Sequence, residues 1–329
     1  MDYITNEDTI IFSPEFNKEL DSNLLLNYNK IIFSNFKLCD DLFDTYSNNN
    51  FNGSDYNYLK FDYLNRNYSN FNLPVDNLPQ SITHLTFGLN FNHPVNLLPQ
   101  TIIQLTFGWK FNLPVDNLPQ SITHLSFGAC FDLLVNLLPS TLTHLTFGLN
   151  FDHPVNLLPQ TIIQLSFGHN FNHPVNLSLP NLTHLIFGNY FNQPINNLPK
   201  NITHLSIGLN FNQQCDLPSN VKYLRLNSDN DYLINNLPNG VEELNLGNYF
   251  MTELDNLPNG VKKIIFEFDS YYNNELNSLP NFLEYLVLPL RYNKKILNIP
   301  PKLKKIKCSQ NYKFVDDFTN TDIDVEFIN

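Results

Sequence analysis

Short runs of alternating apolar and polar residues recur along the chain, and each run ends in glycine. In residues 81–88, apolar Leu85 and Phe87 alternate with polar His84 and Thr86. Alternation with period two is typical of a β-strand that has one buried and one solvated face. The pattern therefore predicts a short strand that ends at Gly88, where glycine permits a backbone turn that a side chain would penalise.

The same unit returns every 20 residues, which is the mark of a repeat architecture. The glycine recurs as Gly88, Gly108, Gly128, Gly148, Gly168, Gly188 and Gly208. A proline keeps the same interval at Pro79, Pro99, Pro119, Pro139, Pro159, Pro180 and Pro199, and continues with small shifts to Pro300. Weaker copies of the strand lie at residues 10–12, 31–33, 59–61, 264–266, 286–288, 305–307 and 325–327. We therefore expect about sixteen rungs and no separate second domain.

A 20-residue unit with a single strand cannot bury its apolar face alone, but stacked units can. Phe91 recurs at every period as far as Phe211, which predicts a column of stacked phenylalanines in the core. The prolines favour extended backbone and leave little room for helices. The chain is therefore predicted to be a repeat solenoid with a continuous, curved parallel β-sheet.

Two resemblances follow from these residues. The spacing Ile82-x-x-Leu85-x-Phe87-x-x-Asn90 resembles a short leucine-rich repeat, and the string LPxSITHLTFGxxFNxPV resembles the FNIP repeat family. The resemblance is strongest over residues 71–212 and extends more loosely to about residue 310. It implies a right-handed, leucine-rich-repeat-like coil with the sheet on the concave face and a mostly non-helical convex side. Some members of this family carry an F-box, but residues 1–50 lack its helical pattern.

The regularity of the repeats divides the chain into four segments. Residues 1–70 are expected to be degenerate N-terminal capping repeats, and residues 71–212 regular repeats. Residues 213–310 are expected to continue the same solenoid with divergent repeats, and residues 311–329 to form a C-terminal cap.

Composition and charge exclude several classes of protein. The net charge is −12, which disfavours a protein that tracks nucleic-acid phosphates. The sequence has no apolar tract of the roughly 18 residues that a membrane span needs, and its N-terminus lacks a signal-peptide pattern. The four cysteines are far apart, which favours free thiols in the cytoplasm. No catalytic motif, metal site or cofactor site is assigned, and the chain is interpreted as a non-enzyme.

A polar column is predicted on the exposed face of the strands. Neighbouring pairs such as His124/His144 and His184/His204 could share a metal ion. Because no cysteine or carboxylate accompanies them, the interpretation favours a hydrogen-bonded polar ladder. Its members are His84, Gln104, His124, His144, Gln164, His184 and His204.

Two asparagine-rich columns follow the strands. One starts at Asn90, the position of the leucine-rich-repeat asparagine, and the other at Asn92. Either could form an internal ladder that satisfies backbone groups of the next coil, and the sequence does not decide between them. Asp132 and Asp152 in the second column raise a calcium alternative, which the absence of a calcium-loop motif disfavours.

The exposed positions stay nearly constant to about residue 210 and diversify afterwards. Aromatic and charged side chains at such positions are typical of protein interfaces. The basic residues near the C-terminus could meet an acidic partner or form a solvated cap. The tentative partner-binding residues are Tyr223, Arg225, Glu243, Lys263, Tyr285 and Lys305, together with Trp109 in the regular half.

The predicted function is a non-catalytic scaffold that binds an unidentified protein partner through the concave sheet, without nucleic acid or membrane. The alternatives are the substrate-recognition subunit of a ubiquitin ligase and a self-assembling structural protein. The sequence does not specify the oligomeric state, although a monomer is slightly favoured.

Overall fold

The computed structural model describes residues 2–35, 69–319 and 321–328. It contains two compact units, which are described separately. Unit 1 comprises residues 1–173 and 179–181, and unit 2 comprises residues 174–178 and 182–329, each within the described ranges. The rung predicted at residues 59–61 lies outside the described residues, as does Cys39.

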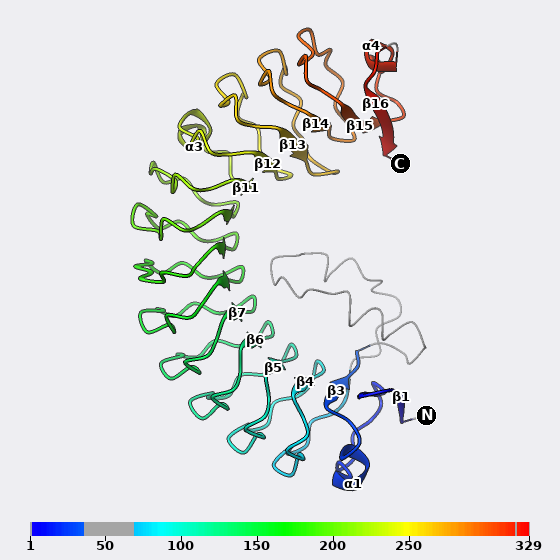
Figure 1. The fold of residues 1–329 in the computed structure, drawn as a ribbon, viewed down its shortest axis with the longest axis vertical. Helices are drawn as coiled ribbons and strands as arrows, with labels where there is room; N and C mark the ends of the chain where they lie inside the picture. Colours follow the sequence, from blue (N-terminus) through cyan, green and yellow to red (C-terminus); the bar gives the residue numbers. More distant parts are fainter. Residues whose placement is uncertain (1, 36–68, 320, 329) are drawn as a thin grey trace. The chain divides into compact units, whose positions relative to one another are not determined.

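Unit 1 begins with an antiparallel hairpin, β1 (Tyr3–Asn6) and β2 (Thr9–Phe12), and continues with parallel strands (Figure 1). A short helix, α1 (Ser22–Leu25), precedes β3 (Lys30–Phe33). Strand β3 pairs directly with β4 (His84–Thr86), and Ser69 donates its backbone N–H to the Asn35 side chain at 3.2 Å. The remaining strands are β5 (Gln104–Thr106), β6 (His124–Ser126), β7 (His144–Thr146) and β8 (Gln164–Ser166).

Unit 2 is a parallel stack of longer and more varied strands. Its described helices, α3 (Asp231–Asn235) and α4 (Asp316–Thr319), have five and four residues. The strands are β9 (His184–Ile186), β10 (His204–Ile207), β11 (Tyr223–Leu226), β12 (Glu243–Leu246), β13 (Lys263–Phe266), β14 (Tyr285–Val287), β15 (Lys305–Ser309) and β16 (Asp324–Ile328).

The alternating pattern of the sequence produces the two faces of each sheet. In β4 the side chain of Leu85 is buried, whereas His84 and Thr86 are half-buried on the other face. Each strand pairs in register, so that His84 lies beside Gln104 and Leu85 beside Leu105. Equivalent residues of successive coils therefore form continuous columns, which confirms the predicted solenoid.

Phenylalanine fills the core, as the repeat predicts. Within a coil, Phe87 and Phe91 stack with ring centroids 3.6 Å apart. Between coils, Phe87 stacks on Phe107 at 5.8 Å and Phe91 on Phe111 at 6.2 Å. The core of unit 1 therefore contains two adjacent phenylalanine columns instead of the single predicted one.

The predicted role of the repeated glycine is wrong. No described glycine has a positive φ angle, so the turn does not need glycine for its backbone conformation. A Cβ atom on Gly128 would instead lie 1.8 Å from the carbonyl oxygen of Gly108, and one on Gly148 would meet Gly128 equally closely. Glycine recurs because successive coils approach too closely at this position for any side chain.

Candidate functional site

The polar column of unit 1 lies on the exposed face of β4–β8. The Nδ1 atoms of His84, His124 and His144 each lie 2.8 Å from the hydroxyl of the preceding threonine in the same coil. The rings of His124 and His144 stack with centroids 4.1 Å apart. The imidazoles are thus oriented by threonine within a coil and packed ring against ring between two of the coils.

Each histidine of the column is preceded by threonine, whereas Gln104 and Gln164 follow Ile103 and Ile163. This pairing is visible in the sequence but was not among the predictions. The hydroxyl explains the pairing, because it binds Nδ1 and fixes the ring. Thr-His and Ile-Gln are therefore two versions of the same exposed dipeptide.

In unit 2 the column begins with a stack of three rings. His184 and His204 lie 3.9 Å apart between centroids, and Tyr223 stacks on His204 at 4.2 Å. Burial lowers the pKa of both histidines, and the nearby His184 lowers the pKa of His204 further. Tyr223 is 41% exposed, so the stack ends in an accessible aromatic side chain.

The charged side chains farther along the unit 2 face pair with one another. Arg225 of β11 binds Glu267, which follows β13 and was not among the predicted residues. Lys263 lies 3.1 Å from Glu243, and Lys305 lies 2.7 Å from Glu326. These charges therefore compensate each other within the chain.

Several of the lysines near the C-terminus form ion pairs within the chain. Lys304 lies 2.7 Å from Glu284, and Lys295 lies 3.3 Å from Asp317. Lys307 binds Glu326. Part of the basic charge at this end is therefore compensated by acidic side chains of the chain itself.

Apolar side chains lie between these ion pairs on the unit 2 face. Ile265 of β13 pairs in register with Val287 of β14, and both are half-buried on the same face. Tyr285 lies one coil beyond Lys263, whose ammonium group is 5.4 Å from the centre of the tyrosine ring. We define the unit 2 face as the exposed side chains of β9–β15; its apolar centre is Ile265, Tyr285 and Val287.

The second asparagine column, and not the first, forms a ladder of hydrogen bonds between coils. Asn92 and Asn112 are exposed, so this ladder lies on the surface and is not internal as predicted. In unit 1 the Oδ1 atom of Asn92 accepts the backbone N–H of Asn112 at 3.0 Å, and Asn112 accepts that of Asp132 at 3.0 Å. The column that starts at Asn90 makes less regular contacts, including a 3.4 Å bond from Asn170 to Asn150.

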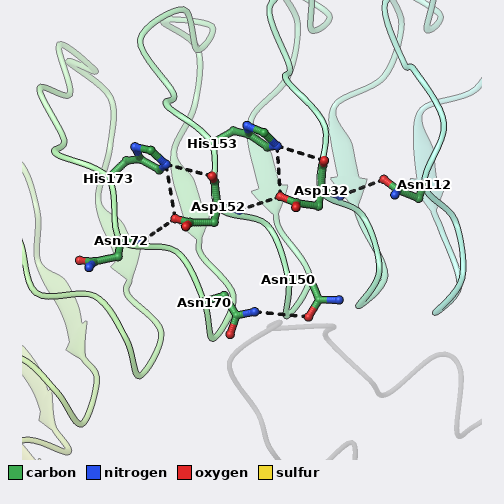
Figure 2. A network of polar contacts seen from close by, with 8 residues as sticks. All are labelled: Asn112, Asp132, Asn150, Asp152, His153, Asn170, Asn172 and His173. Atoms are coloured by element: carbon green, nitrogen blue, oxygen red, sulfur yellow. Dashed lines mark hydrogen bonds and ion pairs between the residues drawn. The ribbon is translucent and has the colours of Figure 1, made fainter.

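Two aspartates and two histidines extend this ladder (Figure 2). Asp132 accepts the backbone N–H of Asp152 at 3.1 Å, and the His153 Nε2 atom lies 3.0 Å from the Asp132 carbonyl and 3.2 Å from its carboxylate. His173 makes the equivalent contacts with Asp152. The carboxylate oxygens that a calcium site would need thus hold the next coil in place.

Trp109 and the free cysteines complete the candidates from sequence. Trp109 is 44% exposed in the turn after β5. The adjacent Lys110 lines an open groove with Asn90 and Cys130. Cys130, Cys215 and Cys308 are free thiols, and burial raises the pKa of the latter two. Within the described ranges, no three or more His, Cys, Asp or Glu side chains cluster as a metal site would require.

Stacked 20-residue coils and an in-register parallel sheet define a solenoid of the leucine-rich-repeat class. The FNIP repeat model matches residues 68–110, 91–130, 111–150, 151–190, 178–210, 191–229, 211–249 and 230–269. The chain belongs to the FNIP repeat family.

One solved structure shows the same fold, and a second matches more loosely. The circular leucine-rich-repeat protein CroV588 matches 99% of this chain with 28% identity and a TM-score of 0.68. The match covers 54% of the CroV588 chain, so this chain spans about half of its length. YopM from Yersinia enterocolitica WA-314 has 20% identity and a TM-score of 0.45, with 73% of this chain and 57% of YopM covered. No curated protein matches the sequence. None of the helices in the described part is long and apolar enough to cross a membrane.

Proposed function

We propose that this protein is a non-catalytic scaffold that binds a protein partner through the unit 2 face. Its membership of a leucine-rich-repeat-like family supports an interaction role. The observation that carries the proposal is an apolar and aromatic centre bordered by charges that already have partners in the chain. Residues of this type anchor protein interfaces, and a surrounding polar rim excludes water.

Electrostatics favour this face as a docking surface. A partner that covers Ile265 and Tyr285 leaves the pairs Lys263–Glu243 and Arg225–Glu267 intact. Binding therefore avoids the penalty of burying isolated charges. The face also lacks the excess positive charge that nucleic acid binding requires.

The free thiols support a cytosolic location for this scaffold. Cys130, Cys215 and Cys308 form no disulfide within the described part of the chain, as expected in a reducing compartment.

Affinity purification with quantitative mass spectrometry tests the proposal. The bait variant Y223A/Y285A removes the exposed ring of Tyr223 and the half-buried ring of Tyr285 from the face without touching the core. The matched control L97A/L157A truncates two leucines of unit 1 that are 66% and 65% exposed. A partner lost by the first variant and retained by the control supports the proposal, provided that both variants unfold like the wild type.

The identity of what is captured separates the alternatives. Subunits of a ubiquitin ligase would indicate a substrate receptor, and a second copy of the chain would indicate self-assembly. A partner that both variants retain would contradict docking at the unit 2 face.

A further inference from the structure

Large exposed side chains occupy the turns that follow strands β12, β13 and β14 of unit 2, outside the unit 2 face. Tyr249, Tyr271 and Arg291 lie in three successive coils, and each directly precedes a buried aromatic residue. In unit 1 the corresponding residue is often asparagine, such as Asn90 before Phe91. Both tyrosines are 58% exposed. We call Tyr249, Tyr271 and Arg291 the turn row.

The core holds the two tyrosines of the turn row at the spacing of the coils. The buried rings of Phe250 and Tyr272 stack with centroids 6.0 Å apart. The exposed rings of Tyr249 and Tyr271 have almost the same separation, 6.2 Å, with planes inclined by 36°. The backbone N–H of Tyr271 also donates to the Asn248 carbonyl of the preceding coil at 3.1 Å. The exposed rings are therefore anchored by their buried neighbours and by the backbone.

Arg291 continues the row as a cation. Its Cζ atom lies 6.0 Å from the centre of the Tyr271 ring, a distance at which the ring attracts the guanidinium group. Among the described residues Arg291 has no ion-pair partner, whereas Arg225 on the unit 2 face pairs with Glu267. The N–H donors of Arg291 are thus available to a carboxylate from outside the chain.

We propose that the turn row binds an extended segment of a partner protein that presents two aromatic side chains and one acidic side chain at alternate positions. Alternate side chains of an extended chain lie on one face about 6.6 Å apart. This spacing matches the 6.2 Å between the tyrosine rings and the 6.0 Å from Tyr271 to Arg291. Every second residue of the segment therefore faces one member of the row.

Each member of the row makes a definite contact with such a segment. The aromatic side chains of the segment pack against Tyr249 and Tyr271, because offset and tilted ring pairs are favourable. Its carboxylate accepts two N–H groups of Arg291, the geometry in which arginine binds carboxylates most strongly. Tyrosine and arginine are also enriched among the residues that dominate the energy of protein interfaces.

Charge favours a protein segment over a nucleic acid as the occupant. A single strand could stack its bases on exposed tyrosines, but it also needs a basic groove that follows its phosphates. The row supplies one cation, and the chain carries a net charge of −12. The row lies in turns and shares no residue with the unit 2 face, so each surface can be tested without altering the other.

Fluorescence anisotropy of the full chain with two labelled peptides, Phe-Ser-Phe-Ser-Glu and its reverse, tests the proposal. We expect saturable binding of at least one peptide, and a loss of affinity of about tenfold or more in both Tyr271→Ala and Arg291→Ala. The matched control Phe282→Ala removes another aromatic side chain of unit 2, 56% exposed and outside the row, and should bind as the wild type does. Y223A/Y285A should also bind normally, since it alters only the unit 2 face.

A charge exchange separates recognition from a structural effect. Arg291→Glu should lose the peptide that ends in glutamate and should bind better when lysine replaces that glutamate, a reversal that a damaged fold cannot produce. Absence of saturable binding of either peptide at millimolar concentration would overturn the proposal, as would the same peptide preference in Arg291→Glu and the wild type. Binding of an oligothymidine strand that is lost in Tyr271→Ala would also overturn it, in favour of a nucleic-acid site.

Discussion

The close approach of successive coils makes a single methyl group a severe perturbation. In Gly128→Ala the new Cβ would lie 1.8 Å from the Gly108 oxygen, 2.4 Å from its carbonyl carbon and 2.9 Å from the Trp109 nitrogen. Non-bonded carbon and oxygen atoms approach to about 3.3 Å, so the two coils must separate by about 1.5 Å. All three contacts are backbone atoms, which cannot rotate away.

The cost follows from this geometry. Overpacking of a well-packed interior costs about 1–3 kcal/mol and occasionally more, and a collision between two backbones belongs at the upper end. We therefore expect Gly128→Ala to lower the free energy of unfolding by about 3 kcal/mol. The matched control is Gly240→Ala, whose Cβ would meet its closest neighbour, the Ser219 oxygen, at 3.0 Å.

Urea unfolding monitored by fluorescence measures the difference. Trp109 is the single tryptophan of the chain, and its backbone contacts the new methyl group, so it reports the disturbed coil directly. We expect Gly240→Ala to cost less than 1 kcal/mol, well below the cost of Gly128→Ala. Equal unfolding midpoints for the two variants would refute the argument that coil spacing selects glycine.

Three further predictions concern single polar groups. The Tyr272 hydroxyl is buried and has no hydrogen-bond partner, so Tyr272→Phe should maintain or raise the free energy of unfolding. The control Tyr312→Phe removes a 2.9 Å hydrogen bond to a backbone carbonyl and should cost about 1 kcal/mol. Chemical denaturation measures both. Asn112→Asp keeps the Oδ1 acceptor that the ladder uses and should leave the free energy of unfolding unchanged. Asn112→Leu removes this acceptor and should lower the free energy of unfolding by about 1 kcal/mol. Equal effects of the two variants would contradict a stabilising role of the ladder. Burial, and to a lesser extent Lys30, lowers the pKa of His84, so the unfolded chain binds the proton first. Stability should therefore fall as the pH drops below about 6.5, until His84 is protonated in the folded state as well, and His84→Gln should flatten this dependence in thermal melts across pH.

The periodicity predicted the fold because each repeat expresses the same local rule many times. The strand, the phenylalanine column and the degenerate rungs at residues 10–12, 31–33 and 325–327 follow from alternation and spacing alone. The role of glycine could not be predicted, since it depends on the distance between coils. The choice between the two asparagine columns likewise required the position of the next coil's backbone N–H groups.

The candidate site could be predicted only in part. The residue types on the exposed strands identified Tyr223, Arg225 and Tyr285 as accessible positions. Their partners could not be predicted from spacing: Arg225 binds Glu267, which lies 42 residues away in sequence. Because these charges form ion pairs within the chain, the unit 2 face is an apolar centre bordered by compensated charges and not the charged interface that the sequence predicts.

Hydroxyl-radical footprinting of the purified chain with its captured partner tests the proposed binding face most directly. We expect the partner to protect the side chains of Tyr223 and Tyr285 from oxidation. Trp109 of unit 1 and Tyr190, which are 44% and 50% exposed and are not part of the unit 2 face, should react as they do in the free chain. Unchanged oxidation of Tyr223 and Tyr285, with protection elsewhere, would contradict binding through the unit 2 face.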